Sequence, residues 1–163
     1  MVADTLQTFE GRGGFAQAVL ALAAAADDAR APAHWYWADP DFVAWPLDDP
    51  ALIAALAAWL ARPGRQLTLL ACGYDALARA HPRFVDWRRP RAHLVHGWQV
   101  AVDASQMPGL FLARAPHLLE LGERDRWRGR WGRDALQWRA GREWVDALIQ
   151  QAAPAFAVTP LGL

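Results

Sequence analysis

The chain has 163 residues, 54% of them hydrophobic, which is the length and composition of a single domain with one ordinary core. Its 17 basic and 17 acidic residues cancel, which excludes a general attraction to nucleic acid or to an anionic membrane. Any anion site must therefore be local. All 17 basic residues are Arg, so chemistry that needs a lysine, such as a Schiff base or a P-loop, is excluded as well.

The cysteine content and the apolar segments predict a cytoplasmic protein with no membrane contact. Cys72, the single cysteine, cannot form an internal disulfide and is expected to be a small buried residue. The apolar run 14–26 follows Asp4 and Glu10, which outweigh Arg12, and it is far shorter than the ~20 residues that span a bilayer. We expect a core helix there.

The first half of the chain predicts alternating strands and helices. A short strand over 5–9 leads through a glycine-rich turn into a helix over 15–29. Segment 33–45 is rich in aromatic residues and is interrupted by a proline, which favours a strand, a turn and an extended piece. Asp49 is a suitable N-cap for the next helix, with Pro50 at its first position.

The second half continues this alternation. Segment 66–72 is short and continuously apolar, as expected for a strand buried on both faces, and a short helix over 74–81 follows it. The last element is predicted to be a helix over 133–153. Between these two helices lie three extended segments, at 92–96, 98–103 and 110–113. The pattern indicates one α/β domain over residues 1–163, a mixed sheet with helices on both faces.

One short segment carries a possible catalytic signature. Residues 96–103 read HGWQVAVD, which places His96 and Asp103 seven positions apart. This resembles the His-x-Lys-x4-Asp motif of the phospholipase D superfamily, with Trp98 at the position of the lysine. The order of elements resembles one half of that fold. Segment 49–87 also resembles a phospholipase D-like domain of unknown function seen in proteobacterial proteins.

The resemblance implies both a chemistry and an assembly. His96 would stand at the nucleophile position, Asp103 would support a histidine, and two such half-domains would pair, here as a homodimer. In-line displacement at phosphorus needs cations around the developing charge, and losing one such contact costs ~3 kcal/mol or more. The indole of Trp98 has one N–H donor and no charge. The Gly-Ser-x-Asn element expected after the motif is replaced by the sequence FLARA at 111–115.

These departures favour a degenerate half-domain that acts as a non-catalytic binding or assembly module, without a cofactor. A phosphate-containing ligand would bind in an Arg-lined anion pocket near His96 and Asp103. Its candidate binding residues are Arg91, His93, Trp98 and Arg114. No metal site is predicted, because His93 and His96 are three apart on a predicted strand and face opposite ways.

Two alternative functions stay open. The first is a divergent phosphodiesterase or nuclease in which two His96 residues meet across a homodimer and Arg replaces Lys, which requires His96 to be exposed beside a guanidinium. The second is a binder of single-stranded nucleic acid, since cations and flat rings alternate within 124–133. Its candidate residues are Arg126, Trp127, Arg128, Arg130 and Trp131.

A structural interpretation of segment 124–133 competes with the nucleic-acid one. In it the segment is a surface loop or helix start, where arginines neutralise nearby acidic residues and the Trp rings anchor the core. The net charge of zero favours this interpretation, so nucleic acid is not the expected partner.

Ten Trp residues are many for the core of one domain. We therefore expect Trp35, Trp37 and Trp45 at a sheet edge, where a partner chain could cover them.

Overall fold

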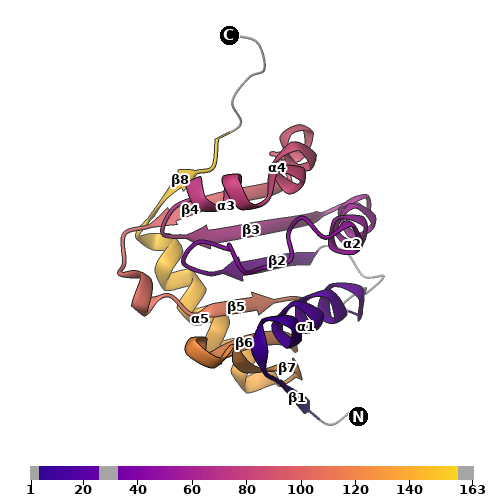
Figure 1. Cartoon of the computed structure of the whole chain (residues 1–163), viewed down its shortest axis with the longest axis vertical. Coiled ribbons are helices and arrows are strands. Elements are labelled where there is room, and N and C mark those ends of the chain that lie inside the picture. The colour runs from indigo at the N-terminus through magenta and orange to yellow at the C-terminus, as the bar shows by residue number, and fades with distance from the viewer. Residues whose placement is uncertain (1–3, 26–32, 158–163) are drawn as a thin grey trace.

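The computed structural model describes residues 4–25 and 33–157, which form one α/β domain (Figure 1). Its strands are β1 (Thr5–Phe9), β2 (Ala33–Ala38), β3 (Arg65–Ala71), β4 (Val95–Val100), β5 (Gly109–Leu112), β6 (His117–Glu123), β7 (Arg128–Arg133) and β8 (Ala152–Ala155). Its α-helices are α1 (Gly11–Ala25), α2 (Pro50–Leu60), α3 (Asp75–Ala80), α4 (Pro82–Arg88) and α5 (Ala135–Gln150). Three short 3-10 turns are η1 (Arg89–Arg91), η2 (Ala104–Gln106) and η3 (Arg124–Arg126).

The strands of the described ranges form a single eight-stranded sheet in the order β1-β7-β6-β5-β2-β3-β4-β8. Its centre is parallel, because β2 pairs with β3 and β3 with β4 in the same direction. The remaining neighbours are antiparallel. The expected mixed sheet is therefore confirmed.

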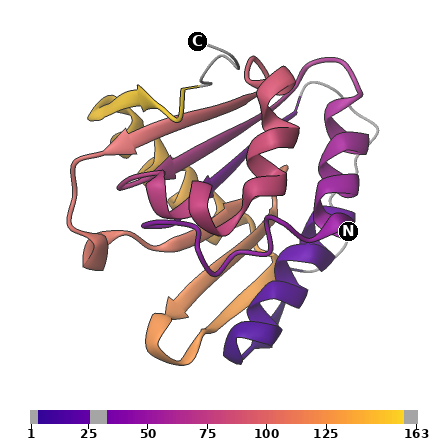
Figure 2. The same ribbon diagram turned by 45° about the horizontal axis from the view of Figure 1, so that its top comes forward.

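Helices cover both faces of this sheet, as predicted. Helices α1 to α4 lie on one face and α5 lies on the other (Figures 1 and 2). On the first face, Phe15 of α1, Leu56 of α2 and Phe84 of α4 join a large apolar cluster with the inward side chains of the sheet. On the second face, Val145 and Leu148 of α5 pack in a separate cluster. The sheet thus divides two cores, which is typical of a layered α/β domain.

Local sequence explains why the central elements form where they do. The Asp49 carboxylate accepts a hydrogen bond from the Ala51 N–H at 2.8 Å, and Pro50 begins α2, so the predicted cap is confirmed. In β3, Leu67 and Leu69 face the first cluster while Leu70 faces the second. A strand between two cores must be apolar on both sides, which is why this segment shows no alternation.

The predicted edge position of the three tryptophans is wrong. Strand β2 lies between β5 and β3 near the centre of the sheet, and Trp35 and Trp37 are 0% exposed. Trp45, in the turn region after β2, is 1% exposed. The Trp35 ring stacks on Trp59 of α2 at 3.9 Å between centroids. An aromatic-rich strand suits either an edge under a partner or a crowded centre, and here the face that carries Trp35 and Trp37 packs against α1 and α2.

Several boundaries also differ from the predictions. The residues expected as a turn at 11–14 already belong to α1, and the expected end of this helix at 29 lies outside the described residues. The short helix predicted over 74–81 is followed at once by a second helix, α4. This helix begins at Pro82, because a proline is well suited to a first turn. The extended segments 92–96 and 98–103 largely merge into a single strand, β4, which continues through Gly97.

Three strands were missed, namely β6, β7 and β8. The basic segment 124–133 is a 3-10 turn followed by β7, not a loop or a helix start.

Cys72 is half-exposed and not buried, with its thiol 3.4 Å from the Val102 carbonyl oxygen. No helix in the described ranges has both the length and the apolar character needed to cross a bilayer.

Candidate functional site

His96 lies on β4, on the face of the sheet that carries α5. Residues alternate between the faces of a strand, so His96 and Trp98 point to one side and Gly97 to the other. Across the sheet, His96 pairs with Thr68 on β3, and Thr68 pairs with Tyr36 on β2. Both His96 and Trp98 are half-buried, so each retains some access to solvent.

A cluster of polar side chains surrounds His96, and we call it the His34–His96 patch: His34, Tyr36, Thr68, His96 and Arg142. The Nε2 atom of His34 lies 2.6 Å from Oγ1 of Thr68. The His34 ring stacks on Tyr36 with centroids 4.2 Å apart and planes 11° apart. The Arg142 guanidinium of α5 lies 4.2 Å from the centroid of the Tyr36 ring.

Burial and neighbouring charge control the ionisation of the patch. Burial, together with the smaller effects of the positive charges of Arg142 and His96, lowers the pKa of His34 from 6.5 to about 4. Burial raises the pKa of the Tyr36 hydroxyl, with Arg142 opposing this effect and Asp146 adding to it. At neutral pH His34 is thus uncharged. The permanent cation of the patch is Arg142, which is paired with Asp146 on the next turn of α5.

The backbone of Trp98, next to Gly97, is held from the opposite face of the sheet. The Tyr74 hydroxyl accepts a hydrogen bond from the Trp98 N–H at 3.1 Å. The same hydroxyl lies 2.8 Å from the Trp98 carbonyl and 3.0 Å from the Leu69 carbonyl, to which it can donate. Burial raises the pKa of this hydroxyl, so it keeps its proton. The positions of His96 and Trp98 are therefore set by β3, β4 and Tyr74 together.

Asp103 does not approach His96. His96 lies near the start of β4 and Asp103 lies beyond its end, and the strand from His96 to Val100 alone spans roughly 13 Å. The Asp103 carboxylate accepts hydrogen bonds from the N–H of Ser105 at 2.8 Å and from its hydroxyl at 2.7 Å. These bonds lower the pKa of Asp103 and cap turn η2. In this chain Asp103 shapes a turn at the opposite end of β4.

The other predicted ligand-binding residues are dispersed. Arg91 donates to the Trp87 carbonyl at 2.7 Å and lies over the Trp87 ring. His93 is exposed in the turn before β4. Arg114 follows β5, and two strands lie between β5 and β4. The backbones of β5 and β4 are therefore about 14 Å apart across the sheet. Of this set, Trp98 is the one that shares a strand and a face with His96.

Four patch residues were missed from the sequence: His34, Tyr36, Thr68 and Arg142. A signal existed for two of them, because alternation along segment 33–38 places His34 and Tyr36 on the same face of a strand. Arg142 had no such signal. Its position over Tyr36 depends on the angle at which α5 crosses the sheet.

The arginine and tryptophan segment is arranged around the first core. The Trp127 ring lies 5.2 Å from the Phe15 ring, and Trp131 also packs against the first apolar cluster. Arg128 pairs with Glu10 at 3.1 Å and lies 3.8 Å from Glu123. Arg130 lies 3.9 Å from Glu120, and Arg126 is exposed. The rings therefore anchor the core while several of the cations lie beside acids.

The patch gathers several groups that can form hydrogen bonds or stack. It offers two imidazoles, a phenol, an indole next to it and one guanidinium, all of which can donate or accept hydrogen bonds or stack. Thr68, the hydroxyl beside His34, is buried and so out of reach of a substrate. Among the described residues, no three His, Cys, Asp or Glu side chains lie where they could hold a metal ion.

Comparison with known proteins gives no match to any family model, and no curated protein matches either. The solved structures with a similar fold include the following two. One is TrmBL2, an archaeal chromatin protein with a novel mode of DNA binding, with a TM-score of 0.65 and 12% identity over 94% of this chain. The other is Nuc from Salmonella typhimurium, a phospholipase D family member, with a TM-score of 0.60 and 9% identity over 95% of this chain.

The two likenesses differ in how much of each neighbour they cover. The chain spans 54% of TrmBL2, about half of it, but 100% of Nuc. At such low identities the likeness concerns the fold alone. The structure is thus an α/β domain with a mixed eight-stranded sheet whose fold resembles that of a phospholipase D family member.

Proposed function

We propose that this domain is a non-catalytic binding or assembly module, and that the His34–His96 patch is its contact surface. One observation carries the proposal. The residue two positions beyond His96 on the same face is Trp98, and the guanidinium of the patch, Arg142, is paired with Asp146 and stacked on Tyr36. A phosphoryl group at His96 would therefore lack the cations that its transition state needs.

The composition of the patch supports a role in contacts between macromolecules. Tyr, Trp and Arg are the residue types that contribute most to protein interfaces, since each combines a large apolar surface with hydrogen-bonding groups. Trp98 and Arg142 lie here with two histidines, and the buried Tyr36 ring supports His34 and Arg142 from beneath. We propose a second copy of the chain as the partner, with the two patches facing each other across a twofold axis.

The catalytic part of this proposal is tested with a chromogenic phosphodiester. Wild type and His96→Ala should hydrolyse it at the same background rate, because the one guanidinium of the patch, that of Arg142, is already paired with Asp146. His93→Ala serves as the matched control, since His93 is exposed in the turn before β4 and outside the patch. Turnover by wild type that disappears in His96→Ala but not in His93→Ala would overturn the non-catalytic assignment.

The assembly part is tested by light scattering after size-exclusion chromatography. Wild type should elute as a dimer, and Trp98→Ala should shift it to a monomer because an interface anchor is lost. The control is again His93→Ala, which should stay dimeric. A wild-type monomer at every concentration would exclude pairing through the patch.

Nucleic acid is not the proposed partner. Base stacking needs exposed rings, and Trp127 and Trp131 pack against the first core. The phosphate contacts would fall to arginines that lie beside Glu10, Glu120 and Glu123. Fluorescence anisotropy with a labelled oligonucleotide should accordingly show no binding at physiological salt.

A further inference from the structure

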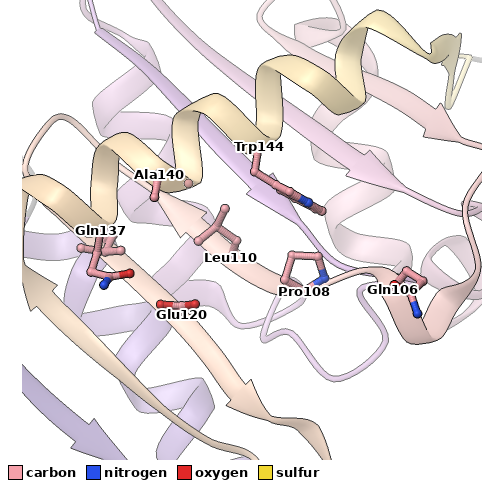
Figure 3. Close-up of a pocket in the computed structure, with 9 residues that line it drawn as sticks. Gln106, Pro108, Leu110, Glu120, Gln137, Ala140 and Trp144 are labelled. Carbon is pink, nitrogen blue, oxygen red and sulfur yellow. The ribbon is translucent and has the colours of Figure 1, made fainter.

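A cavity lies on the α5 side of the sheet, apart from the His34–His96 patch. None of its lining residues belongs to that patch. It is a cavity of about 320 Å³ between α5, the first part of β5, β6 and turn η2. Leu110 forms its floor and Trp144 of α5 forms one wall (Figure 3), and Leu118 also lines it. The cavity is within the range of size of pockets that bind small molecules.

Close packing of the helix leaves this hollow beside it. A Cβ at Gly141 would lie only 3.1 Å from a methyl carbon of Leu112, so α5 approaches β5 closely at that point. One turn further along, the Trp144 ring extends from the helix toward Pro108, as Figure 3 shows. The space between the floor and this ring is apolar. An apolar body could fill it without displacing core side chains.

The polar groups of the cavity determine which ligand would fit. The lining contains one charged residue, Glu120, together with the amides of Gln106 and Gln137. In Figure 3 the Glu120 carboxylate and Gln137 lie near each other at one end of the hollow. A carboxylate and amide oxygens accept hydrogen bonds, and an indole face attracts cations. The site is thus complementary to a positive charge.

We propose that this cavity binds a small organic amine. Its ammonium group would pair with Glu120 and its apolar body would lie on Leu110, Leu118 and Trp144. Arg130 is the competing cation, but its Nη2 lies 3.9 Å from Oε2 of Glu120, and both side chains are about half exposed, at 52% and 41%. Such an exposed, loose pair contributes little and can be displaced.

The test uses 2-phenylethylamine as the probe and follows the indole N–H signal of Trp144 by NMR, assigned through Trp144→Phe. The amine should shift this signal and saturate, and 3-phenylpropionate should bind at least about tenfold more weakly because Glu120 repels it. Glu120→Gln should weaken amine binding by about tenfold. Arg130→Gln should strengthen it, since the competing cation is gone.

Two further variants complete the design. Ala140 is an exposed residue at the rim, so Ala140→Trp should fill the cavity and abolish binding while the protein stays folded. Glu143→Gln removes an exposed carboxylate from the same helix outside the cavity and should leave affinity unchanged. His96→Ala should also bind normally, which separates this site from the proposed contact patch.

Three results would overturn the proposal. The first is the absence of a saturable shift with the amine. The second is equal affinity for the amine and the carboxylate, and the third is equal affinity in wild type and Glu120→Gln. The last two outcomes would describe an apolar hollow without charge selectivity.

Discussion

At the scale of single residues, His34 is the group whose ionisation the fold changes most strongly within the His34–His96 patch. Its ring is stacked on Tyr36 and bonded to Thr68, so it has lost much of its contact with water. Arg142 and His96 further oppose a positive charge on it. Folding thus requires His34 to stay neutral, and the stability of the protein becomes coupled to pH.

This coupling has a definite sign. Unfolded His34 takes up a proton near pH 6.5, whereas folded His34 does so only near pH 4. The unfolded state therefore binds more protons between these values, so the free energy of unfolding should fall as pH drops from 6.5 to 4. After allowance for solvent screening at this partly exposed ring, we expect the His34 contribution to be about 1–2 kcal/mol.

The measurement is urea denaturation at a series of pH values. His34→Gln should flatten the decline over this window, since glutamine does not titrate. His93→Gln should retain the full decline, because His93 is exposed in a turn. Identical pH profiles for wild type and His34→Gln would contradict the prediction.

At the scale of elements, the contact between β4 and β8 depends on a missing side chain. Strand β8 pairs antiparallel with β4 and places Ala155 opposite Gly97. Phe156 follows it, and its ring stacks on Tyr74 at 4.7 Å. Arg88 donates to the Phe156 carbonyl at 2.6 Å and also lies over the ring. Strand pairing, ring stacking and the Arg88 hydrogen bond thus hold the end of the described chain against Gly97.

Gly97→Ala should weaken the packing of β8 on β4 and lower the stability of the protein. The new Cβ would lie 2.7 Å from Phe156 Cβ and 3.1 Å from the Ala155 carbonyl oxygen, so β8 must move. Overpacking of this kind costs about 1–3 kcal/mol, which a shift in the denaturation midpoint would report. In Gly73→Ala, the control, the added Cβ meets nothing within 4 Å. Equal losses in the two variants would show that the cost is not steric.

At the scale of the whole molecule, one ion pair joins distant parts of the chain at the end of the sheet. Asp39 follows β2 and is 1% exposed, and its carboxylate accepts a hydrogen bond from Arg124 at 2.9 Å. The same carboxylate accepts the Phe42 N–H at 2.9 Å, which shapes the turn after β2. Arg124 belongs to turn η3 after β6, so the pair connects the central parallel strands to the antiparallel half of the sheet.

Arg124→Met should destabilise the whole domain. It leaves the buried Asp39 charge without its cation, and breaking such a pair costs about 2–4 kcal/mol when one partner is partly exposed. Arg126→Met, in which an exposed arginine of the same turn is replaced, should change stability by less than about 0.5 kcal/mol. Calorimetry would report the difference, and equal melting temperatures would refute it.

Much of the fold could be predicted because local chemistry specifies it. The cap at Asp49, the largely apolar β3 and the amphipathic α5 are each determined by residues close in sequence. Strands β6 and β7 were missed because their charged residues resemble those of a loop. Neither segment has a strong strand pattern of its own. The two become strands because they pair with each other and with neighbouring strands, and their composition alone does not show this.

The sequence by itself determined the fold class and the absence of lysine side chains, since these depend on residue types and short spacings. Only the tertiary structure decided that Trp35 and Trp37 are central, that Asp103 lies far from His96, and that His34, Tyr36 and Arg142 gather beside it. The reason is physical. Strand order and the crossing of α5 arise from long-range packing, which no local pattern of side chains encodes.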